Sequence, residues 1–575
     1  MMHVLSLAKL QSARFIAFSL LIMALPVLIS EGYLLNVFVF VGIHTMLAVA
    51  LNLLLGYAGQ ISLGQAAFFG LGAYASGILT ATYGWNPWLA MVAVAGAVGI
   101  LAFAIGFPIL KLKGHYLAMA TLGFGIIVYI IFNEAVELTG GPSGFPGIPN
   151  LEVGSVTFDS DLKNYYLIWG IALVTILLSV NLVNSRIGRG LRAIHDSEVA
   201  ARVMGVNVRL LKVQVFALSA VISSVAGSLY AHTMTFVSPT SFGFNFSVEL
   251  VTMVIIGGLG SIYGSFLGAT LLTLLPELLR AFQDYDIVVY GLLLIFMTMF
   301  MPGGSCAASR ICCTGSAPAW IRGLPMLEVR GITQRFGGVT ALDDVSFTIQ
   351  GGGITGIIGP NGAGKTTLFN IVTGIYTPTA GTVLLDGRNV TRLAPEKLAT
   401  LGMVRTFQNI ELFGKMTVLE NVMVGLHTKG KSGIFASALR APWQMAEERR
   451  LRERALHWLE FTGIADLADV DAANLPFGKG RLLEIARSMA LEPKLILMDE
   501  PAAGLNSRET LELARLIQKI RESGVTVALV EHDMELVMDI CEAIVVLNLG
   551  RTLAQGTPRE IQENPDVIAA YLGEG

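Results

Sequence analysis

The chain has 575 residues, of which 53% are hydrophobic and only 14% are charged, and its formal net charge is −3. A chain of this length is too long for one hydrophobic core, and this balance of residue types excludes a purely soluble protein. The small net charge gives no indication of a nucleic-acid partner, and none is expected. Because the apolar runs end near residue 300, we predict an all-α polytopic membrane domain over 1–301, a linker over 302–325 and a soluble domain over 326–575.

The first domain contains a series of apolar runs, each close to the roughly 20 residues that a helix needs to cross a bilayer. The first run continues into others and lacks a small-residue cleavage site, so no removable signal peptide is expected. The predicted spans are 14–30, 33–55, 66–83, 88–110, 116–133, 164–184, 212–233 and 285–301, with a longer apolar region at 248–282.

The basic residues predict the orientation of these spans, because lysine and arginine are concentrated on the cytoplasmic side. They occur near residues 9–14, at 111–113 and most densely at 186–212. This pattern places the N-terminus in the cytoplasm and the acidic loop 134–163 outside. Glycines at 257–260 can divide the region 248–282, and a divided region returns the chain to the cytosol after ten crossings; eight crossings are the alternative.

Two further stretches, 56–77 and 140–147, are dense in glycine. Unwound backbone of this kind often lines the substrate path of a transporter. Small residues also allow two helices to pack closely. Both interpretations remain open from the sequence.

The predicted cytoplasmic loop 186–212 is long and amphipathic and contains the run 198–205. It resembles the coupling loop of bacterial ABC importer permeases, in which a short helix with the pattern E-A-A-x-x-x-G docks on the ATPase. Ala200, Ala201 and Gly205 fit this pattern, whereas the acidic residue, Glu198, comes one position early. A positively charged helix at the membrane surface is the alternative.

The linker is rich in glycine, serine and alanine and shows no periodicity, so we assign it no function. It contains three of the four cysteines of the chain, and no cluster of histidine and cysteine has zinc-like spacing. We therefore expect unpaired thiols in a reducing compartment. The cysteines are Cys306, Cys312, Cys313 and Cys541.

A glycine-rich loop at 359–367 lies between an apolar run at 354–358 and a predicted helix. This order of strand, loop and helix is the context in which a G-x-x-x-x-G-K-[ST] loop holds nucleotide phosphates with backbone N–H groups and a helix N-terminus. Lys365 is expected to reach the β- and γ-phosphates and Thr366 to bind Mg²⁺. The predicted ATP-binding residues of the loop are Gly359, Pro360, Asn361, Gly362, Ala363, Gly364, Lys365, Thr366 and Thr367.

From residue 327 the order strand, turn, strand, phosphate loop resembles the beginning of an ATP-binding cassette, an α/β P-loop NTPase fold. The resemblance implies that Phe336 stacks on adenine, with a core phenylalanine as the alternative. It further implies that Gln408 contacts both Mg²⁺ and the attacking water. Asp499 and Glu500 follow an apolar strand, so Asp499 is expected to hold Mg²⁺ and Glu500 to polarise the water. His532 fits the switch histidine at the γ-phosphate, and a structural histidine is the alternative.

The segment 475–481 stands where a cassette carries its L-S-G-G-Q signature. Gly478 is retained and is expected to contact nucleotide, and Lys479 is a possible source of charge. Pro476 has neither a hydroxyl nor a backbone N–H, so phosphate donors are missing. Asn506 also stands where cassettes usually have aspartate. We therefore expect a composite site that hydrolyses slowly or depends on groups from its partner.

Residues of about 325–575 resemble the ATPase subunit of the branched-chain (hydrophobic) amino acid uptake family, through the runs 404–408, 499–506 and 564–573. Residues of about 30–300 resemble a permease subunit of the same family, through 52–64 and 188–205. The resemblance implies a multi-pass half-transporter of the bacterial inner membrane that hydrolyses ATP in the cytoplasm to import amino acids.

The same resemblance implies the partners. These are a second permease and a second ATPase, or a second copy of this chain, together with an extracytoplasmic binding protein, membrane lipid and a small amino-acid substrate. Import of urea or short amides is the alternative within this class, and export of hydrophobic compounds is the alternative outside it.

Overall fold

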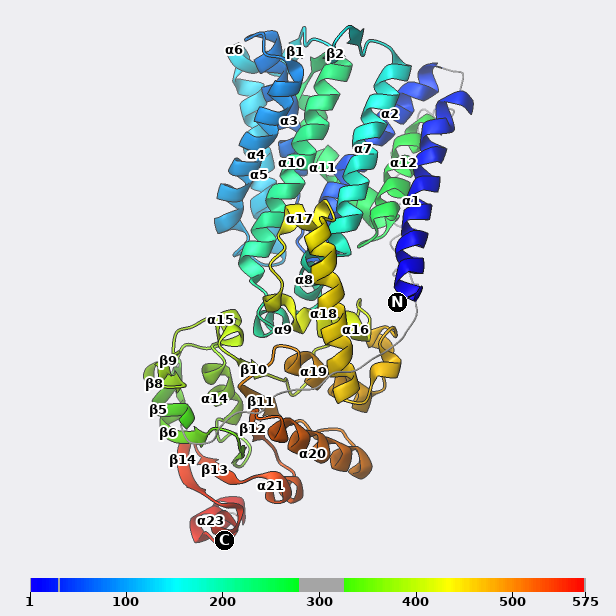
Figure 1. Ribbon diagram of the computed structural model, residues 1–575. Coiled ribbons are helices and arrows are strands. Elements are labelled where there is room, and N and C mark those ends of the chain that lie inside the picture. The colour runs from blue at the N-terminus through cyan, green and yellow to red at the C-terminus, as the bar shows by residue number, and fades with distance from the viewer. Residues whose placement is uncertain (1, 29–31, 279–324, 573–575) are drawn as a thin grey trace. The chain divides into compact units, whose positions relative to one another are not determined.

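A computed structural model describes residues 2–28, 32–278 and 325–572 (Figure 1). The chain divides into two compact units, and each unit contains a short stretch of sequence that interrupts the other. We call Met1–His195, Val208–Cys306 and Gly433–Ala441 the helical unit. We call Asp196–Asn207, Ala307–Ser432 and Pro442–Gly575 the sheet unit. An α-helical first part and an α/β second part were predicted, and both are confirmed.

The helical unit consists of long apolar helices joined by short connections. Five stretches of the described residues are long and apolar enough to cross a membrane: Gly32–Tyr57, Pro87–Ile109, His115–Glu134, Asp161–Val183 and Val208–Met234. The predicted span 285–301 lies outside the described residues, so the number of crossings stays a prediction. The long helices are α1 (Met2–Leu28), α2 (Gly32–Asn52, followed by a π-helical turn at Leu53–Tyr57), α3 (Gln65–Ala81), α4 (Pro87–Ile109), α5 (His115–Glu134), α7 (Asp161–Val183), α10 (Val208–Met234), α11 (Phe244–Gly257) and α12 (Ile262–Leu278).

The helices α2 and α10 form the centre of this unit. Helix α2 is apolar all round, as expected of a helix that other helices surround, and it contacts α7, α10, α11 and α12. Helix α10 lies against α3 and α4. The α3–α10 contact depends on glycine, because a Cβ at Gly72 would lie 2.1 Å from the Ser224 carbonyl oxygen and a Cβ at Gly227 would lie 2.0 Å from that of Phe69. Close packing is therefore the arrangement of this part of the stretch 56–77.

The apolar region 248–282 is broken between α11 and α12, at the glycines that were predicted to divide it. Gly258 and Gly260 have φ values of 100° and 76°, which favour glycine. The Asn52 side chain satisfies the exposed backbone: its Nδ2 donates to Ser261 O at 2.9 Å, and its Oδ1 accepts from Gly260 N–H at 2.9 Å. One buried amide thus supports a helix break inside an apolar bundle.

Short elements lie between the long helices. The stretch 140–147 contains no long helix, and its chain turns at glycines with positive φ. The remaining elements of the unit are α6 (Val136–Thr139), the 3₁₀ turns Gly141–Ser143 and Pro239–Phe242, the antiparallel pair β1 (Phe145–Pro146) and β4 (Phe236–Val237), the pair β2 (Glu152–Val153) and β3 (Val156–Thr157), α8 (Arg186–Asp196), whose last residue falls in the sheet unit, and α17 (Ile434–Ala438).

The sheet unit contains a six-stranded sheet of order β10-β11-β12-β7-β13-β14, in which only β14 runs antiparallel. The expected order of strand, turn, strand and phosphate loop is confirmed by β5, β6 and β7. The strands of the large sheet are β7 (Ile354–Ile358), β10 (Met403–Arg405), β11 (Leu495–Asp499), β12 (Thr526–Val530), β13 (Ala543–Asn548) and β14 (Arg551–Gly556). A second sheet of order β6-β5-β8-β9 comprises β5 (Pro325–Phe336), β6 (Val339–Gln350), β8 (Ala380–Leu385) and β9 (Arg388–Asn389).

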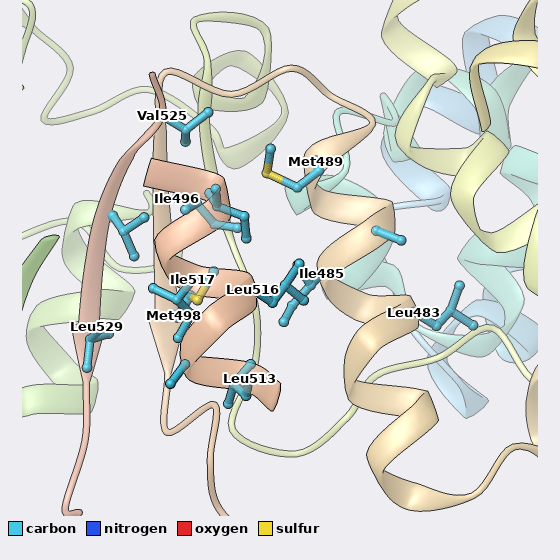
Figure 2. Close-up of a cluster of buried hydrophobic side chains, with 14 of the residues drawn as sticks. Leu483, Ile485, Met489, Ile496, Met498, Leu513, Leu516, Ile517, Val525 and Leu529 are labelled. Atoms are coloured by element: carbon cyan, nitrogen blue, oxygen red, sulfur yellow. The ribbon is translucent and has the colours of Figure 1, made fainter. Parts of the chain in front are cut away.

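Helices pack against the large sheet through aliphatic side chains. Figure 2 shows Ile496 and Met498 of β11 beside Leu513 and Ile517 of α20, while Ile485 of α19 lies opposite. The strands β7, β11 and β12 are buried along their whole length, as parallel strands covered on both faces are. The helices of the unit are α9 (Glu198–Val203), α14 (Lys365–Val372), α15 (Pro395–Thr400), α16 (Val418–Gly425), α18 (Pro442–Phe461), α19 (Phe477–Met489), α20 (Ser507–Glu522), α21 (Met534–Ile540), α22 (Pro558–Gln562) and α23 (Pro565–Leu572).

Candidate functional site

The predicted ATP-site residues follow neighbouring strands of the large sheet. Strands β11, β12 and β7 pair in parallel, with Asp499 opposite Val530 and Val530 opposite Ile357. Their carboxyl ends therefore meet at one edge, which is where ligands bind in open α/β sheets. The phosphate loop follows β7, Glu500 follows β11, and His532 follows β12.

The phosphate loop runs from β7 into α14, and its glycines permit its shape. Gly364 has a φ of 95° and directly precedes α14, and a Cβ there would lie 2.6 Å from Leu342 Cδ2. Gly359 passes the Leu547 carbonyl so closely that a Cβ would lie 2.1 Å from that oxygen. Only glycine fits either position without displacement. Asn361 and Gly362 are exposed at the tip, whereas Ala363 is buried in the core.

The Lys365 side chain folds back over the loop. Its Nζ donates to the carbonyl oxygens of Gly359 at 2.7 Å and Pro360 at 3.0 Å. Burial lowers the pKa of Lys365 below its ordinary value, against the opposite effect of the carboxylates of Glu500 and Asp499. A phosphate group would add negative charge beside the ammonium, and the N-terminus of α14 favours an anion at the same place.

The residues predicted to hold Mg²⁺ offer the oxygen ligands that this ion prefers. Thr366 is exposed in the first turn of α14, with Thr367 beside it in sequence. The Asp499 carboxylate is buried; its Oδ2 accepts from Arg405, whereas its Oδ1 has no hydrogen-bond partner among the described residues. A buried carboxylate oxygen without a partner is costly unless a cation or its water shell approaches it. The donor set therefore fits Mg²⁺.

The three residues predicted to be catalytic meet at one carboxylate. Gln408 Nε2 donates to Glu500 Oε2 at 2.8 Å, and His532 Nε2 lies 3.0 Å from Glu500 Oε1. Glu500 itself has a φ of 44°, a backbone conformation that is uncommon for residues other than glycine and is often associated with function. The turn is held by a hydrogen bond from Glu500 N–H to the Val530 carbonyl, at 2.9 Å.

Three buried charged residues around this group were not predicted from the sequence. Arg405 pairs with Asp499 at 2.6 Å. Arg481 donates to the backbone carbonyls of Phe407, at 2.7 Å, and Gln408, at 2.9 Å. Glu484 accepts from the Phe407 N–H at 2.9 Å and pairs with Arg481 at 2.8 Å. Helix α19 thereby fixes the backbone that carries Gln408. Arg481 and Glu484 are spaced three residues apart in the sequence, but this spacing alone does not indicate burial, because exposed pairs on a helix share it.

Phe336 ends β5 with 45% of its surface exposed, so it is not a core residue. Its ring lies 5.6 Å from that of Tyr376 in an edge-to-face arrangement. Tyr376 is also half-exposed and was not singled out from the sequence. Two accessible aromatic rings on the sheet unit are suited to stacking on a flat base.

The altered signature segment begins α19. Pro476 is the N-cap residue of the helix and makes no side-chain capping bond. Gly478 is approached by a carboxylate, because a Cβ there would lie 2.4 Å from Glu509 Oε1. Asn506 caps α20 through a reciprocal pair with Glu509, in which its Oδ1 accepts from the Glu509 N–H at 3.0 Å. Asn506 therefore has a structural role that aspartate would fill equally well.

Within the predicted coupling loop 186–212, Asp196–Asn207 belongs to the sheet unit, whereas the residues on either side belong to the helical unit. Ser197 caps α9 by accepting from the Ala200 N–H at 3.2 Å. Helix α9 lies against α15, and Gly205 follows it with a φ of 78°. A Cβ at Gly205 would lie 2.3 Å from Thr428 Cγ2, so the chain that follows α9 passes very close to this threonine.

Of the four cysteines, only Cys541 falls among the described residues. It is buried beside the sheet, and burial raises the pKa of its thiol to about 12. The thiol therefore stays protonated and unreactive at neutral pH. Cys306, Cys312 and Cys313 lie outside the described residues.

Three family models match successive parts of the chain. Residues 33–298 match the permease component of the branched-chain amino acid transport system. Residues 342–503 match the ABC transporter model, and residues 551–575 match a model described as the branched-chain amino acid ATP-binding cassette transporter.

Individual relatives agree with these models. The high-affinity branched-chain amino acid transport ATP-binding protein BraF of Pseudomonas aeruginosa is 49% identical over 251 residues, which cover 44% of this chain and 98% of that protein. The corresponding protein LivG of Escherichia coli is 47% identical over 251 residues, with the same coverage. The permease protein LivM of the high-affinity branched-chain amino acid transport system of Escherichia coli is 32% identical over 313 residues, or 50% of this chain and 73% of that protein.

A crystal structure of a nucleotide-free ATP-binding cassette from an ABC transporter is 33% identical, covers 44% of this chain and all of that one, and has a TM-score of 0.39.

Proposed function

The chain belongs to the branched-chain amino acid ABC transporter family, and from this we propose that it imports branched-chain and other hydrophobic amino acids, driven by ATP hydrolysis. Permease and ATPase are fused in one polypeptide, which makes up half of a transporter. The observation that carries the catalytic part of the proposal is the convergence of Gln408 and His532 on the Glu500 carboxylate.

ATP is the substrate of the sheet unit. The phosphate loop surrounds the phosphates with N–H groups, and Lys365 exchanges the two carbonyl oxygens for phosphate oxygens. Thr366, Asp499 and Gln408 would hold Mg²⁺, which when bound neutralises phosphate charge and orients the γ-phosphoryl group. Phe336 stacks on the adenine ring.

Hydrolysis needs a water aligned with the γ-phosphorus. Glu500 polarises this water by accepting a hydrogen bond, and Gln408 and His532 set the direction of the carboxylate. His532 also approaches the γ-phosphate, where charge develops as the bond to the β-phosphate breaks. Arg481 and Glu484 keep the Gln408 backbone in place throughout.

A complete transporter requires a second half. Each ATP of an ABC transporter lies between the phosphate loop of one ATPase and the signature of the other, so this chain pairs with a second permease and a second ATPase, or with its own copy. Gly478 and Lys479 face the nucleotide of the partner. An extracytoplasmic binding protein delivers the substrate. The assembly lies in the bacterial inner membrane, with the ATPase in the cytoplasm.

Helix α9 carries the movement from one unit to the other. It is covalently continuous with α8 and α10 but packs on α15 of the sheet unit. Closure of the ATPases around ATP displaces α9 and turns the permease toward the outside, and hydrolysis resets it.

The test combines two measurements on purified, reconstituted protein. Glu500→Gln abolishes ATP turnover and preserves ATP binding, since the amide keeps the size of the side chain but lacks the negative charge and basicity that polarise the water. Uptake of labelled leucine and of labelled urea by proteoliposomes that contain the binding protein and ATP then identifies the substrate class. Undiminished hydrolysis by Glu500→Gln contradicts the catalytic assignment, and uptake of urea but not of leucine contradicts the substrate.

A further inference from the structure

The short helix α17 comes from the ATPase half of the sequence but packs within the helical unit. It lies against α7, and Asn181 Nδ2 of α7 donates to the Ala438 carbonyl at 2.9 Å. Ser437 and Ala441, four residues apart, are buried. Phe435 and Leu439, also four residues apart, lie on the opposite side of the helix and are 81% and 69% exposed.

Two large apolar side chains left open on a five-residue helix require an explanation, because exposed apolar groups that gather on one face mark contact surfaces. One hydrogen bond, from Asn181 to the Ala438 carbonyl, joins the segment to α7, and the buried residues Ser437 and Ala441 are small. The exposed face is therefore not a by-product of packing.

The position of α17 relative to the bilayer follows from α7, the helix that it contacts. Helix α7 has 23 residues and is apolar enough to cross a membrane. Such a helix is about 34 Å long, slightly longer than the hydrocarbon core of about 30 Å. Asn181 is in its last turn, followed by the basic run that begins at Arg186, so this end lies at the cytoplasmic boundary between acyl chains and headgroups.

The same helix indicates which way the exposed face of α17 points. Val174, Leu177 and Asn181 are spaced three and four residues apart and therefore share one face of α7. Val174 and Leu177 are 55% and 38% exposed, as residues that face lipid are. Helix α17 thus caps the lower end of a lipid-facing stripe, and Phe435 and Leu439 continue that stripe at the level of the headgroups. Arg440, exposed beside them with a φ of 53°, is placed to meet lipid phosphates.

We propose that α17 is an interfacial lipid anchor, with Phe435 and Leu439 inserted into the cytoplasmic leaflet and Arg440 at its phosphates. A helix of the ATPase half is then held by the bilayer as well as by α7. This role is independent of which solute is transported, because it depends only on the contact of α17 with a membrane-spanning helix.

The full chain is tested in nanodiscs of phosphatidylcholine and phosphatidylglycerol, with single cysteines carrying a fluorescent label. The background replaces Cys306, Cys312, Cys313 and Cys541 by alanine. Labels are placed at Phe435→Cys and Leu439→Cys, at Val174→Cys as the lipid control, and at Val339→Cys as the aqueous control, a residue of β6 that is 66% exposed. Quenching is measured with iodide and with lipids that carry a nitroxide near the headgroup.

Labels at 435 and 439 are expected to be quenched severalfold more by the lipid nitroxide than the label at 339, and severalfold less by iodide. Nitroxide near the methyl end of the acyl chain should quench them less than it quenches the label at 174. Iodide quenching equal to that at 339 overturns the proposal in favour of a solvated helix. Insensitivity to both quenchers overturns it in favour of a protein partner that covers α17.

Discussion

The guanidinium of Arg405 donates to Asp499 Oδ2 at 2.6 Å, and both side chains are buried. The same guanidinium donates to Asn370 Oδ1 of α14 at 2.6 Å. One side chain therefore connects the strand that leads to Gln408, the strand that ends at Asp499, just before Glu500, and the helix that begins with Lys365. The relative placement of three of the proposed ATP-site segments depends on this residue.

Arg405→Ala should destabilise the sheet unit strongly, because it leaves the Asp499 carboxylate buried without its hydrogen-bonded ion-pair partner. Removal of one partner of a buried ion pair typically costs about 3–5 kcal/mol. Arg330→Ala is the matched control, since it removes a surface arginine that is 2.5 Å from Glu328, and an exposed pair contributes only about 0–1 kcal/mol. Thermal unfolding of the detergent-solubilised chain measures both, and equal shifts for the two variants would contradict the role of Arg405.

His532→Ala should lower the ATPase kcat by about 10²-fold, the contribution of a well-placed proton-transfer or orienting side chain. Its effect on the KM for ATP should be small, because the phosphate loop and Lys365 supply most of the proposed phosphate contacts and His532 contacts Glu500. His457→Ala, which removes a histidine that packs on Trp458 in α18, should leave kcat unchanged. Steady-state kinetics that show a change in KM alone would place His532 in binding and not in hydrolysis.

ATP binding should take up protons at alkaline pH. Burial lowers the pKa of Lys365 from its ordinary 10.5 in the free protein, whereas phosphate oxygens around the ammonium raise it in the complex. Between these two values the complex binds more protons than the free protein, so ATP affinity falls as pH rises through this window and is constant below it. Titration calorimetry in buffers of different ionisation enthalpy measures the uptake. Lys365→Arg, which stays protonated, should abolish it; an unchanged uptake in that variant would assign the proton to another group.

Gly205→Ala should separate ATP hydrolysis from transport. The residue has a φ of 78°, and a methyl group there would collide with the Thr428 side chain, just after α9. Basal hydrolysis should persist, because no proposed ATP-site residue is touched, while substrate uptake per ATP falls. Gly84→Ala also places alanine at a positive φ but meets no atom within 4 Å, so it serves as the control for strain alone. A proportional loss of hydrolysis and uptake in Gly205→Ala would contradict a coupling role.

Much of this arrangement could be predicted because it is encoded in short runs. The phosphate loop and the acids after β11 combine apolar strands with residues of specific chemistry, and they appear where expected. Arg405, Arg481 and Glu484 could not be found in this way, since a charged residue in a sequence carries no mark of burial and their partners are as many as 94 residues away. The break at Gly258 and Gly260 was visible, but the amide of Asn52 that supports it was not. The position of α17 could not be predicted for the same reason, because its hydrogen bond with α7 joins residues that are 257 positions apart in the sequence.

Uptake of labelled leucine by proteoliposomes that contain the assembled transporter, its binding protein and ATP tests most directly whether ATP drives transport. The chain is compared with its Lys365→Ala variant, which lacks the ammonium that meets the phosphates. We predict ATP-dependent accumulation by the unmodified chain and none by the variant. Accumulation by the variant at the level of the unmodified chain would contradict the claim that phosphate chemistry at this lysine drives movement of the solute.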